Sequence, residues 1–580
     1  MSSSLAWKRN RRWVVGSLVG GGALVALLRE VRITAVTTSE RNAADPLAFD
    51  APGVGDLFDD ETVHDLALDL PAADYAALIE AYREHEEKIY ATASVTIDGT
   101  RLSPVGARLK GNSTLMGLRE GGFFGGSRGP QLPSGCDPEM FAGPAGPGGP
   151  PGAPVPGGLP AGMPVPGEGA LPGGLPAGLT APAEGTPPAG APPVGQPGAD
   201  GATPTAGGFG GLMGSVSADD PSSLPWLVRF DEFTDGQRYQ GLRDIAIRPV
   251  VGNQTSLNEA LALRLVAMAG EPTERAAYAA VTVNGSDPVL RLLLEPPGEA
   301  YAEANDLGDG VLYKALSTGS FTYRGDDPSA YVDQFDQETR RNRQDLKPLI
   351  DLLRWVAESS DEEFAAEIGD RLDAESFARY VALQSLLDNF DDMAGPGQNY
   401  YLWYDLDEQR FRVLAWDLNL ALSGFGDMMG SGGPPSWIPS ACIPEEFREG
   451  ATGSDPAATP GATPAAAADG AGDPSAAGET PRRRRGGPGD RQFGGNLLKE
   501  RFLATPALRA QAEAAFVALQ ADLFASGAAA AELDRLSAVV ASSGLLDPAT
   551  VDAETAALHA KLAAQATAEP AFDKSPFGGG

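Results

Sequence analysis

Histidine and cysteine are scarce in this sequence, and their scarcity excludes several kinds of active site. The 580 residues contain three histidines, His64, His85 and His559, and two cysteines, Cys136 and Cys442. No histidine lies near the densest group of acidic residues, which argues against a Ser-His-Asp hydrolase and against a histidine-rich zinc site. Two cysteines exclude a disulfide-dense scaffold but leave room for one bridge.

Positive charge is also in short supply. The chain has 44 lysines and arginines against 78 aspartates and glutamates, which gives a formal net charge of −34. Nucleic acids are bound by basic surfaces, so this balance argues against a nucleic-acid partner. A polyanion would have to be bound locally, with the help of a metal ion.

The N-terminus has the pattern of a membrane signal anchor. Four basic residues precede an apolar run over residues 13–28, and no Ala-x-Ala cleavage site follows it. The run is short for a full span, which takes roughly 20 apolar residues. We predict an uncleaved single-pass anchor and linker in residues 1–50, with the bulk of the chain extracytoplasmic, or secreted if the segment is cleaved. A buried N-terminal helix is the alternative interpretation. The basic residues are Lys8, Arg9, Arg11 and Arg12.

Two segments rich in proline, glycine and alanine interrupt the chain, at about residues 143–214 and 431–495. The first has no strict Gly-X-Y period, which excludes collagen, and both are predicted to be disordered insertions. Each is preceded or opened by a similar motif that contains a cysteine, Pro-Ser-Gly-Cys136 and Pro-Ser-Ala-Cys442. In an oxidising compartment this symmetry predicts a Cys136–Cys442 disulfide, with two unpaired thiols as the alternative.

The remaining sequence alternates first like strands and later like helices, which predicts an α+β fold class with a mostly antiparallel sheet lobe and a helical lobe. A hairpin is expected around Asn284-Gly285. Strand patterns cover residues 63–71, 90–99, 224–233, 241–249 and 310–316. Helical spacing covers residues 72–88, 256–270, 345–387 and the tail 496–568.

A polar turn follows one of the predicted strands. Gly111-Asn112-Ser113-Thr114 can present several backbone N–H groups and two hydroxyls to a phosphate, and Lys110 adds positive charge. An ordinary polar hairpin turn has the same composition, so this interpretation stays open.

The densest group of metal-type side chains lies in residues 388–426. An acidic cluster opens this stretch, a Gly-Pro-Gly turn follows, and two strands deliver further carboxylate and amide groups at their ends. Such oxygen atoms are the ligands that a hard cation takes. A structural Ca²⁺ site or a set of turn caps would use the same residues. The side chains concerned are Asp388, Asp391, Asp392, Asn399, Asp417 and Asn419.

These motifs and the order of the predicted elements make the chain resemble the spore coat protein H (CotH) kinase family, in an actinobacterial-like branch. The resemblance covers most of residues 56–430 outside the first insertion, and the tail 496–568 as a helical part of the same domain. The Asn-Tyr-Tyr and Trp-Asp-Leu segments at their mutual spacing are its most specific part. The matching pieces are Arg108-Leu-Lys110-Gly111-Asn112-Ser113, the Leu-Asn-Glu259-Ala-Leu helix, Gly310-Val-Leu-Tyr-Lys314, Asn389 to Tyr401 and Trp416-Asp417-Leu-Asn419.

The resemblance implies a two-lobed atypical protein-kinase-like fold. It also implies transfer of the γ-phosphoryl group of ATP, with Mg²⁺ or Mn²⁺, to serine or threonine of an unidentified secreted or surface protein. Asp391 would orient the acceptor hydroxyl, with Asp392 as its rival and Asp388 third. Asp417 would be the chief metal ligand, together with Asn399 and Asn419. The nucleotide would be bound by Lys110, Gly111, Asn112, Ser113 and by Arg229, paired with Glu259.

Two departures and two alternatives accompany this hypothesis. Position 419 is Asn419 where the family often has aspartate, and the sequence has no His-Arg-Asp, Gly-x-Gly-x-x-Gly or Asp-Phe-Gly motif. A catalytically silent, membrane-anchored surface protein with a cation-stabilised loop would keep the same residues. A glycosidase with two carboxylates fits less well, because the acidic groups are too dense for a separated acid and base.

Overall fold

A computed structural model describes residues 47–111, 114–118, 216–249, 254–341, 343–395, 397–423 and 495–572. The predicted N-terminal anchor, the predicted disulfide between Cys136 and Cys442, and the phosphate-binding roles of Asn112 and Ser113 lie outside these residues, so they stay predictions.

The first part of the described chain is a closed barrel of seven strands in the order β2-β3-β4-β5-β7-β9-β8. All neighbouring pairs are antiparallel except β2 with β8, which run parallel and close the barrel. The mostly antiparallel sheet is therefore confirmed, whereas its closure was not predicted. The strands are β2 (Val63–Asp69), β3 (Ala91–Ile97), β4 (Thr100–Leu109), β5 (Trp226–Arg229), β7 (Asp244–Ile247), β8 (Ala276–Val283) and β9 (Val289–Leu294).

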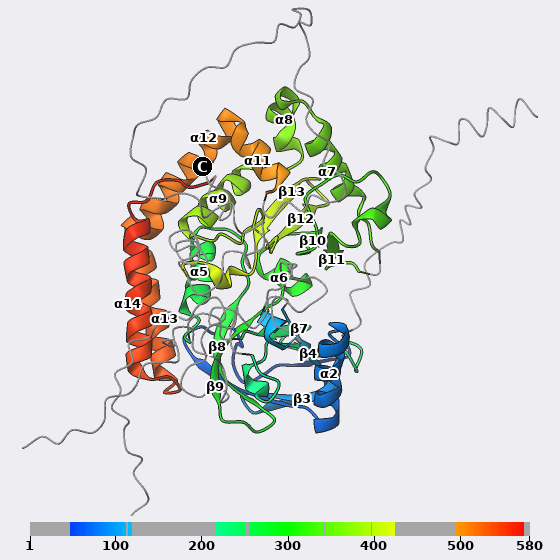
Figure 1. Ribbon diagram of the computed structural model, residues 1–580, viewed down its shortest axis with the longest axis vertical. Helices are drawn as coiled ribbons and strands as arrows, with labels where there is room; N and C mark the ends of the chain where they lie inside the picture. Colours follow the sequence, from blue (N-terminus) through cyan, green and yellow to red (C-terminus); the bar gives the residue numbers. More distant parts are fainter. Residues whose placement is uncertain are drawn as a thin grey trace, which may run out of the picture. The chain divides into compact units, whose positions relative to one another are not determined.

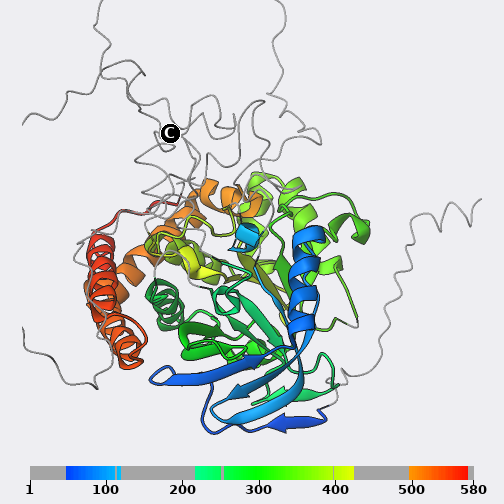
Figure 2. The ribbon, with the colours of Figure 1, turned by 60° about the horizontal axis from the view of Figure 1, so that its bottom comes forward.

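Alternating side chains of these strands fill the barrel with a buried apolar cluster, which includes Leu66, Val95 and the fully buried Trp226. The predicted hairpin joins β8 to β9 through residues 284–288, and it begins with a tight turn at Asn284 and Gly285, both with positive φ. Helix α2 (Ala72–His85) packs against β3 (Figure 2).

A second, four-stranded antiparallel sheet has the order β11-β10-β12-β13. Its strands are β10 (Gly310–Ala315), β11 (Phe335–Gln337), β12 (Tyr400–Asp405) and β13 (Phe411–Ala415). Helix α6 (Glu299–Ala304) shares a small apolar cluster with residues of β10, β12 and β13, while other residues of the sheet belong to the large helical core. A short parallel pair, β1 (Phe49–Ala51) with β6 (Gln237–Tyr239), completes the strands.

Helices surround this second sheet, and the chain's last helices return to earlier parts of the fold (Figure 1). Helix α12 packs against α9, and α13 packs against both α14 and α5. The helices are α5 (Leu257–Met268), α7 (Lys347–Glu358), α8 (Asp361–Glu367), α9 (Ala374–Leu386), α11 (Leu497–Ala504), α12 (Pro506–Leu519), α13 (Ala528–Ser542) and α14 (Pro548–Gln565). Short turns are η1 (Thr114–Leu118), η3 (Pro221–Ser223), η4 (Pro328–Tyr331), η5 (Ile368–Asp370), η6 (Leu418–Leu420) and the π-helical η9 (Gln520–Ala525).

The α+β class and the helical tail are thus confirmed. Within the described ranges no single helix is both long and apolar enough to cross a membrane. One bent pair, residues 506–525 with 528–542, meets the criteria jointly by length and composition.

Candidate functional site

Two basic residues leave the barrel at the same end. Strands β4 and β7 both run antiparallel to β5, and Leu109 and Ile247 lie opposite the same residue, Trp226. The next residue of each strand is therefore carried to the same rim. These residues are Lys110 and Arg248.

Arg248 joins the barrel to a helix and to the second sheet. Its Nε donates to Oε2 of Glu259 on α5 at 3.0 Å, and its Nη2 lies 2.8 Å from Oε1. The same Nη2 contacts Oδ1 of Asp417. One guanidinium thus holds two carboxylates that lie 158 positions apart in sequence, from Glu259 to Asp417 (417 minus 259).

The predicted pairing of Glu259 with Arg229 is wrong, because each has a different partner. Arg229 lies directly opposite Asp244 on the neighbouring strand, and its Nε donates to Asp244 Oδ1 at 2.7 Å. This cross-strand contact holds Arg229 beside Asp244, and Arg248 takes the position beside Glu259.

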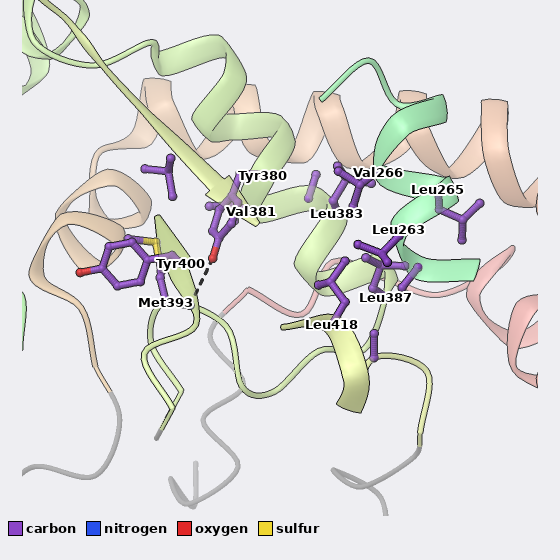
Figure 3. Packing of buried hydrophobic residues seen from close by; sticks show 14 of the residues in the cluster. Leu263, Leu265, Val266, Tyr380, Val381, Leu383, Leu387, Met393, Tyr400 and Leu418 are labelled. Carbon is purple, nitrogen blue, oxygen red and sulfur yellow. Dashed lines mark hydrogen bonds between the residues drawn. The ribbon is translucent and has the colours of Figure 1, made fainter. Parts of the chain in front are cut away.

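Asp417 is held in an unusual backbone conformation by its neighbours. It follows β13 with a φ of +55°, a left-handed conformation that is strained for a residue with a side chain. The adjacent Leu418 is buried against α5 and α9, as Figure 3 shows. Asn258 of α5 donates from Nδ2 to the carbonyl oxygen of Asn419 at 2.6 Å, so the helix fixes the turn that carries Asp417.

Electrostatics keep Asp417 ionised. Burial alone would raise the pKa of its carboxyl group, but Arg248, and more weakly Lys110 and Lys314, outweigh burial and hold the pKa below its ordinary value. Burial also acts to raise the pKa of Glu259, and there it prevails: the pKa is raised even though Arg248 opposes the shift. Of these two carboxyl groups, Asp417 is therefore the one that is held in its ionised form.

Asp391 lies in a loop that is closed around it by hydrogen bonds. Gly397 N–H donates to its Oδ1 at 2.5 Å, and Asn399 Nδ2 donates to its Oδ2 at 2.9 Å. A Cβ on Gly397 would come within 2.5 Å of Asp391 Oδ2, so the glycine of the Gly-Pro-Gly turn permits this close approach. The structure brings the predicted base and the predicted metal ligand Asn399 into direct contact.

Burial raises the pKa of Asp391 to about 7. The N–H of Gly397 opposes this shift, and the negative charge of Asp417 adds to it. The influence of Asp417 indicates that these two carboxylates, 26 residues apart in sequence (417 minus 391), lie in one electrostatic environment. A carboxyl group that titrates near neutrality is suited to proton transfer.

Asp392 has a different set of contacts from Asp391. Its Oδ1 accepts a hydrogen bond from Ala394 N–H at 2.8 Å, and its Oδ2 is bound by Lys499 of α11. Figure 3 shows the next residue, Met393, whose N–H donates to the Tyr380 hydroxyl at 3.2 Å. Asp392 is thus engaged in anchoring the loop to the C-terminal helices. Asp388, the third choice, lies just after α9 with a φ of +47°.

A hollow of about 330 Å³, including space open to solvent, lies at the barrel rim. It joins the predicted phosphate turn to the predicted metal site, because both contribute to its lining. The lining residues are Lys110, Gly111, Thr114, Pro225, Ile247, Arg248, Pro249, Asp417 and Asn419.

Four residues near this hollow were missed as site residues. Arg248, Lys314, Trp416 and Glu274 all interact with the residues described above. The sequence offered one signal, because Lys314 and Trp416 lie within the quoted family motifs. For Glu274 and Arg248 there was none, since their positions depend on the barrel register. Among the described residues, no group of three or more histidine, cysteine, aspartate or glutamate side chains is arranged to hold a metal ion.

Comparison with known proteins places this site within a recognised family. The family model described as CotH kinase protein matches residues 214–562, more than half of the chain. The match contains Arg248, Asp391 and Asp417 but begins after Lys110. The chain is also similar to inner spore coat protein H of Bacillus subtilis (strain 168), at 22% identity over 190 residues. That alignment covers 32% of this chain and about half, 51%, of the relative.

Proposed function

The chain belongs to the CotH kinase protein family, and on this premise we propose that it is an atypical protein kinase. It would transfer the γ-phosphoryl group of ATP, with Mg²⁺ or Mn²⁺, to serine or threonine of a secreted or surface protein. The observation that carries the proposal is the contact of Arg248 with both Glu259 and Asp417, beside a hollow lined by Lys110.

One pair of residues supports this proposal by its resemblance to a pair in ordinary kinases. A basic residue at the end of a strand is paired with a glutamate on the following helix, as the strand lysine and helix glutamate are in ordinary kinases. We therefore extend the proposal to the architecture: the barrel would act as the nucleotide-binding lobe, and the second sheet with its helices as the other lobe. This two-lobed interpretation is supported by the position of Arg248 between the barrel, α5 and the turn after β13.

The donor atoms suit a hard cation. Asp417 uses Oδ1 to contact Arg248, which leaves Oδ2 for a metal ion, and the amide oxygens of Asn399 and Asn419 are neutral oxygen ligands of the kind Mg²⁺ accepts. When bound, the cation would neutralise charge on the phosphate groups. Arg248 orients Asp417, and Lys110 adds positive charge at the rim. Asn419 in place of the family aspartate leaves the site with one negative charge fewer.

Asp391 would receive the proton of the acceptor hydroxyl. Its two oxygens are positioned by Gly397 and Asn399, and its pKa near neutrality suits this role. Asp392, bound by Lys499, would hold the loop in place. The acceptor protein that supplies this hydroxyl and the membrane attachment both belong to the proposal as expectations from the sequence.

The proposal is tested with the full chain and ATP labelled at the γ-phosphate. We expect label to appear on the chain itself or on an added serine-rich protein when Mg²⁺ or Mn²⁺ is present, and to disappear with a chelator. Restoring the cation should restore transfer. A chain that neither transfers label nor binds ATP with either cation would instead be the catalytically silent surface protein.

The rate of transfer is expected to depend on pH through Asp391. Because the base must be deprotonated, the rate should rise about tenfold per pH unit below the pKa of about 7 and level off above it. A cation bound beside Asp417 would move the midpoint to lower pH, because positive charge favours the carboxylate. The measurement is kcat from pH 5 to 8.5 at saturating ATP. Asp391→Asn should abolish this pH dependence of kcat. A midpoint clearly above 7 in the wild type would contradict the assignment of Asp391 as the base.

A further inference from the structure

Trp416, the residue before Asp417, has two lysines beside its ring. The Nζ of Lys314 lies 4.1 Å from the centroid of the indole and the Nζ of Lys110 lies 5.8 Å from it. Tyr401 packs edge-on against the same ring, with centroids 5.3 Å apart and an interplanar angle of 86°. Three elements therefore meet here: the barrel rim through Lys110, strand β10 through Lys314, and the end of β13 through Trp416.

Neither lysine has an ion pair within 4.0 Å among the described residues. The carboxylates that influence Lys314 include Glu338 and Asp417, and both are bound by arginines: Glu338 by Arg341 and Asp417 by Arg248. Asp336 lies opposite Lys314 on β11 without contacting it as an ion pair. Two partly buried ammonium groups are thus held near each other without a direct counter-ion, an arrangement that costs free energy in the empty protein.

Glu274 also influences Lys110, but it forms no ion pair with either lysine within the described residues. Glu274 is 3% exposed, and its Oε1 has no hydrogen-bond partner. It affects the pKa of Lys110 electrostatically, but no contact joins the two groups. Burial lowers the pKa of both lysines, as expected where positive charge is poorly compensated. An anion placed between them would supply the missing charge.

We propose that Lys314 and Lys110, gathered around Trp416, form a two-lysine clamp for the phosphate groups of the bound nucleotide, which makes Lys314 a phosphate-binding residue. The proposal rests on the proposed kinase function for the identity of the nucleotide. Asp417 is the next residue after Trp416, and Lys110 and Asp417 line the same hollow. A polyphosphate that reaches both lysines would therefore also lie beside the cation site, which is how lysine and metal share the charge of a triphosphate in ordinary kinases. Trp416 acts as a platform that holds the two ammonium groups.

The test uses binding measurements on the full chain with three probes: MgATP, inorganic tripolyphosphate and adenosine. Lys314→Met keeps the length of the side chain and removes its charge. We expect it to weaken MgATP and tripolyphosphate about tenfold to a hundredfold, the usual cost of losing a hydrogen bond to a charged group, and to leave adenosine unchanged. Lys347→Met replaces an exposed lysine of α7 that pairs with Asp351; it is the matched control and should change nothing.

Thermal unfolding separates a clamp from a purely structural lysine. Because Lys314 lacks a direct counter-ion, Lys314→Met should unfold at the same temperature as the wild type or higher when no ligand is present. Lys314→Arg restores a charge that binds phosphate and should recover part of the affinity. A fall in unfolding temperature with unchanged affinity for MgATP would overturn the proposal.

The outcomes distinguish this inference from the proposed function. If the wild type transfers phosphate while Lys314→Met binds MgATP equally well, the clamp is refuted and the kinase proposal stands. If the wild type binds no nucleotide but binds tripolyphosphate through both lysines, the clamp stands as an anion site and the kinase proposal fails. If the wild type binds neither, both are refuted.

Discussion

Asp417→Asn is expected to lower the rate of phosphoryl transfer by at least roughly 100-fold, because it removes the one charged ligand of the proposed cation site. Even the outer-shell partners of a metal ligand typically contribute about 10- to 100-fold. The asparagine keeps the shape of the side chain, and Arg248 stays bound to Glu259. The fold should therefore survive, and the loss should fall on the chemical step and on affinity for the cation.

The measurement is labelled-phosphate transfer over a range of Mg²⁺ and Mn²⁺ concentrations, with the unfolding temperature as a check of folding. Asp407→Asn is the matched control, since Asp407 lies in the exposed turn between β12 and β13, away from the barrel rim. If Asp417→Asn retained wild-type activity, Asp417 would not be the metal ligand. Membership of the family would then give this carboxylate no catalytic role.

Arg248→Met is expected to reduce the free energy of unfolding by about 3–5 kcal/mol, the cost of leaving buried charges without their partner. Among the described residues, Arg248 forms the only ion pair with Asp417 and the only ion pair with Glu259. Without it, the buried carboxylate of Glu259 and the partly exposed carboxylate of Asp417 lose their shared positive partner. Urea unfolding followed by circular dichroism measures the change, and phosphoryl transfer should be lost at the same time.

The pH dependence of this loss identifies its cause. Without the arginine the pKa values of Glu259 and Asp417 rise, so the folded variant binds protons that the unfolded chain releases. The deficit should therefore shrink as the pH is lowered from 7 to 5. Arg264→Met, on the exposed side of α5 where Arg264 pairs with Glu532, is the control and should cost about 1 kcal/mol or less. A deficit at position 248 that does not change with pH would point to lost packing instead.

Local patterns in the sequence were sufficient to predict much of the secondary structure. Asn284-Gly285 produced the expected hairpin because this pair favours positive φ at both positions. The helical spacing of residues 345–387 and of the tail became α7 to α9 and α11 to α14. The Gly-Pro-Gly turn brought Asp391 and Asn399 together, since the two residues are only eight positions apart and the turn returns the chain.

Partners that are distant in sequence could not be predicted in the same way. The sequence favoured Arg229 as the partner of Glu259. The register of β5 with β7 instead places Arg229 opposite Asp244, to which it donates a hydrogen bond. The ion pair between Asp392 and Lys499 joins a loop to a helix on the far side of the second insertion. Closure of the barrel depends on the parallel pairing of β2 with β8, and the sequence of neither strand indicates that pairing.

The sequence by itself therefore determined the α+β class, the elements and the acidic residues available for a cation, because these follow from periodicity, turn residues and short-range spacing. Only the tertiary structure decided which charges meet. Arg248, Glu259 and Asp417 come from a strand end, a helix and a turn that are separated in sequence and are brought together by barrel closure and by the packing of α5. Lys110, Lys314 and Trp416 were assembled in the same way, because strand register and burial act between distant segments and leave no local signal.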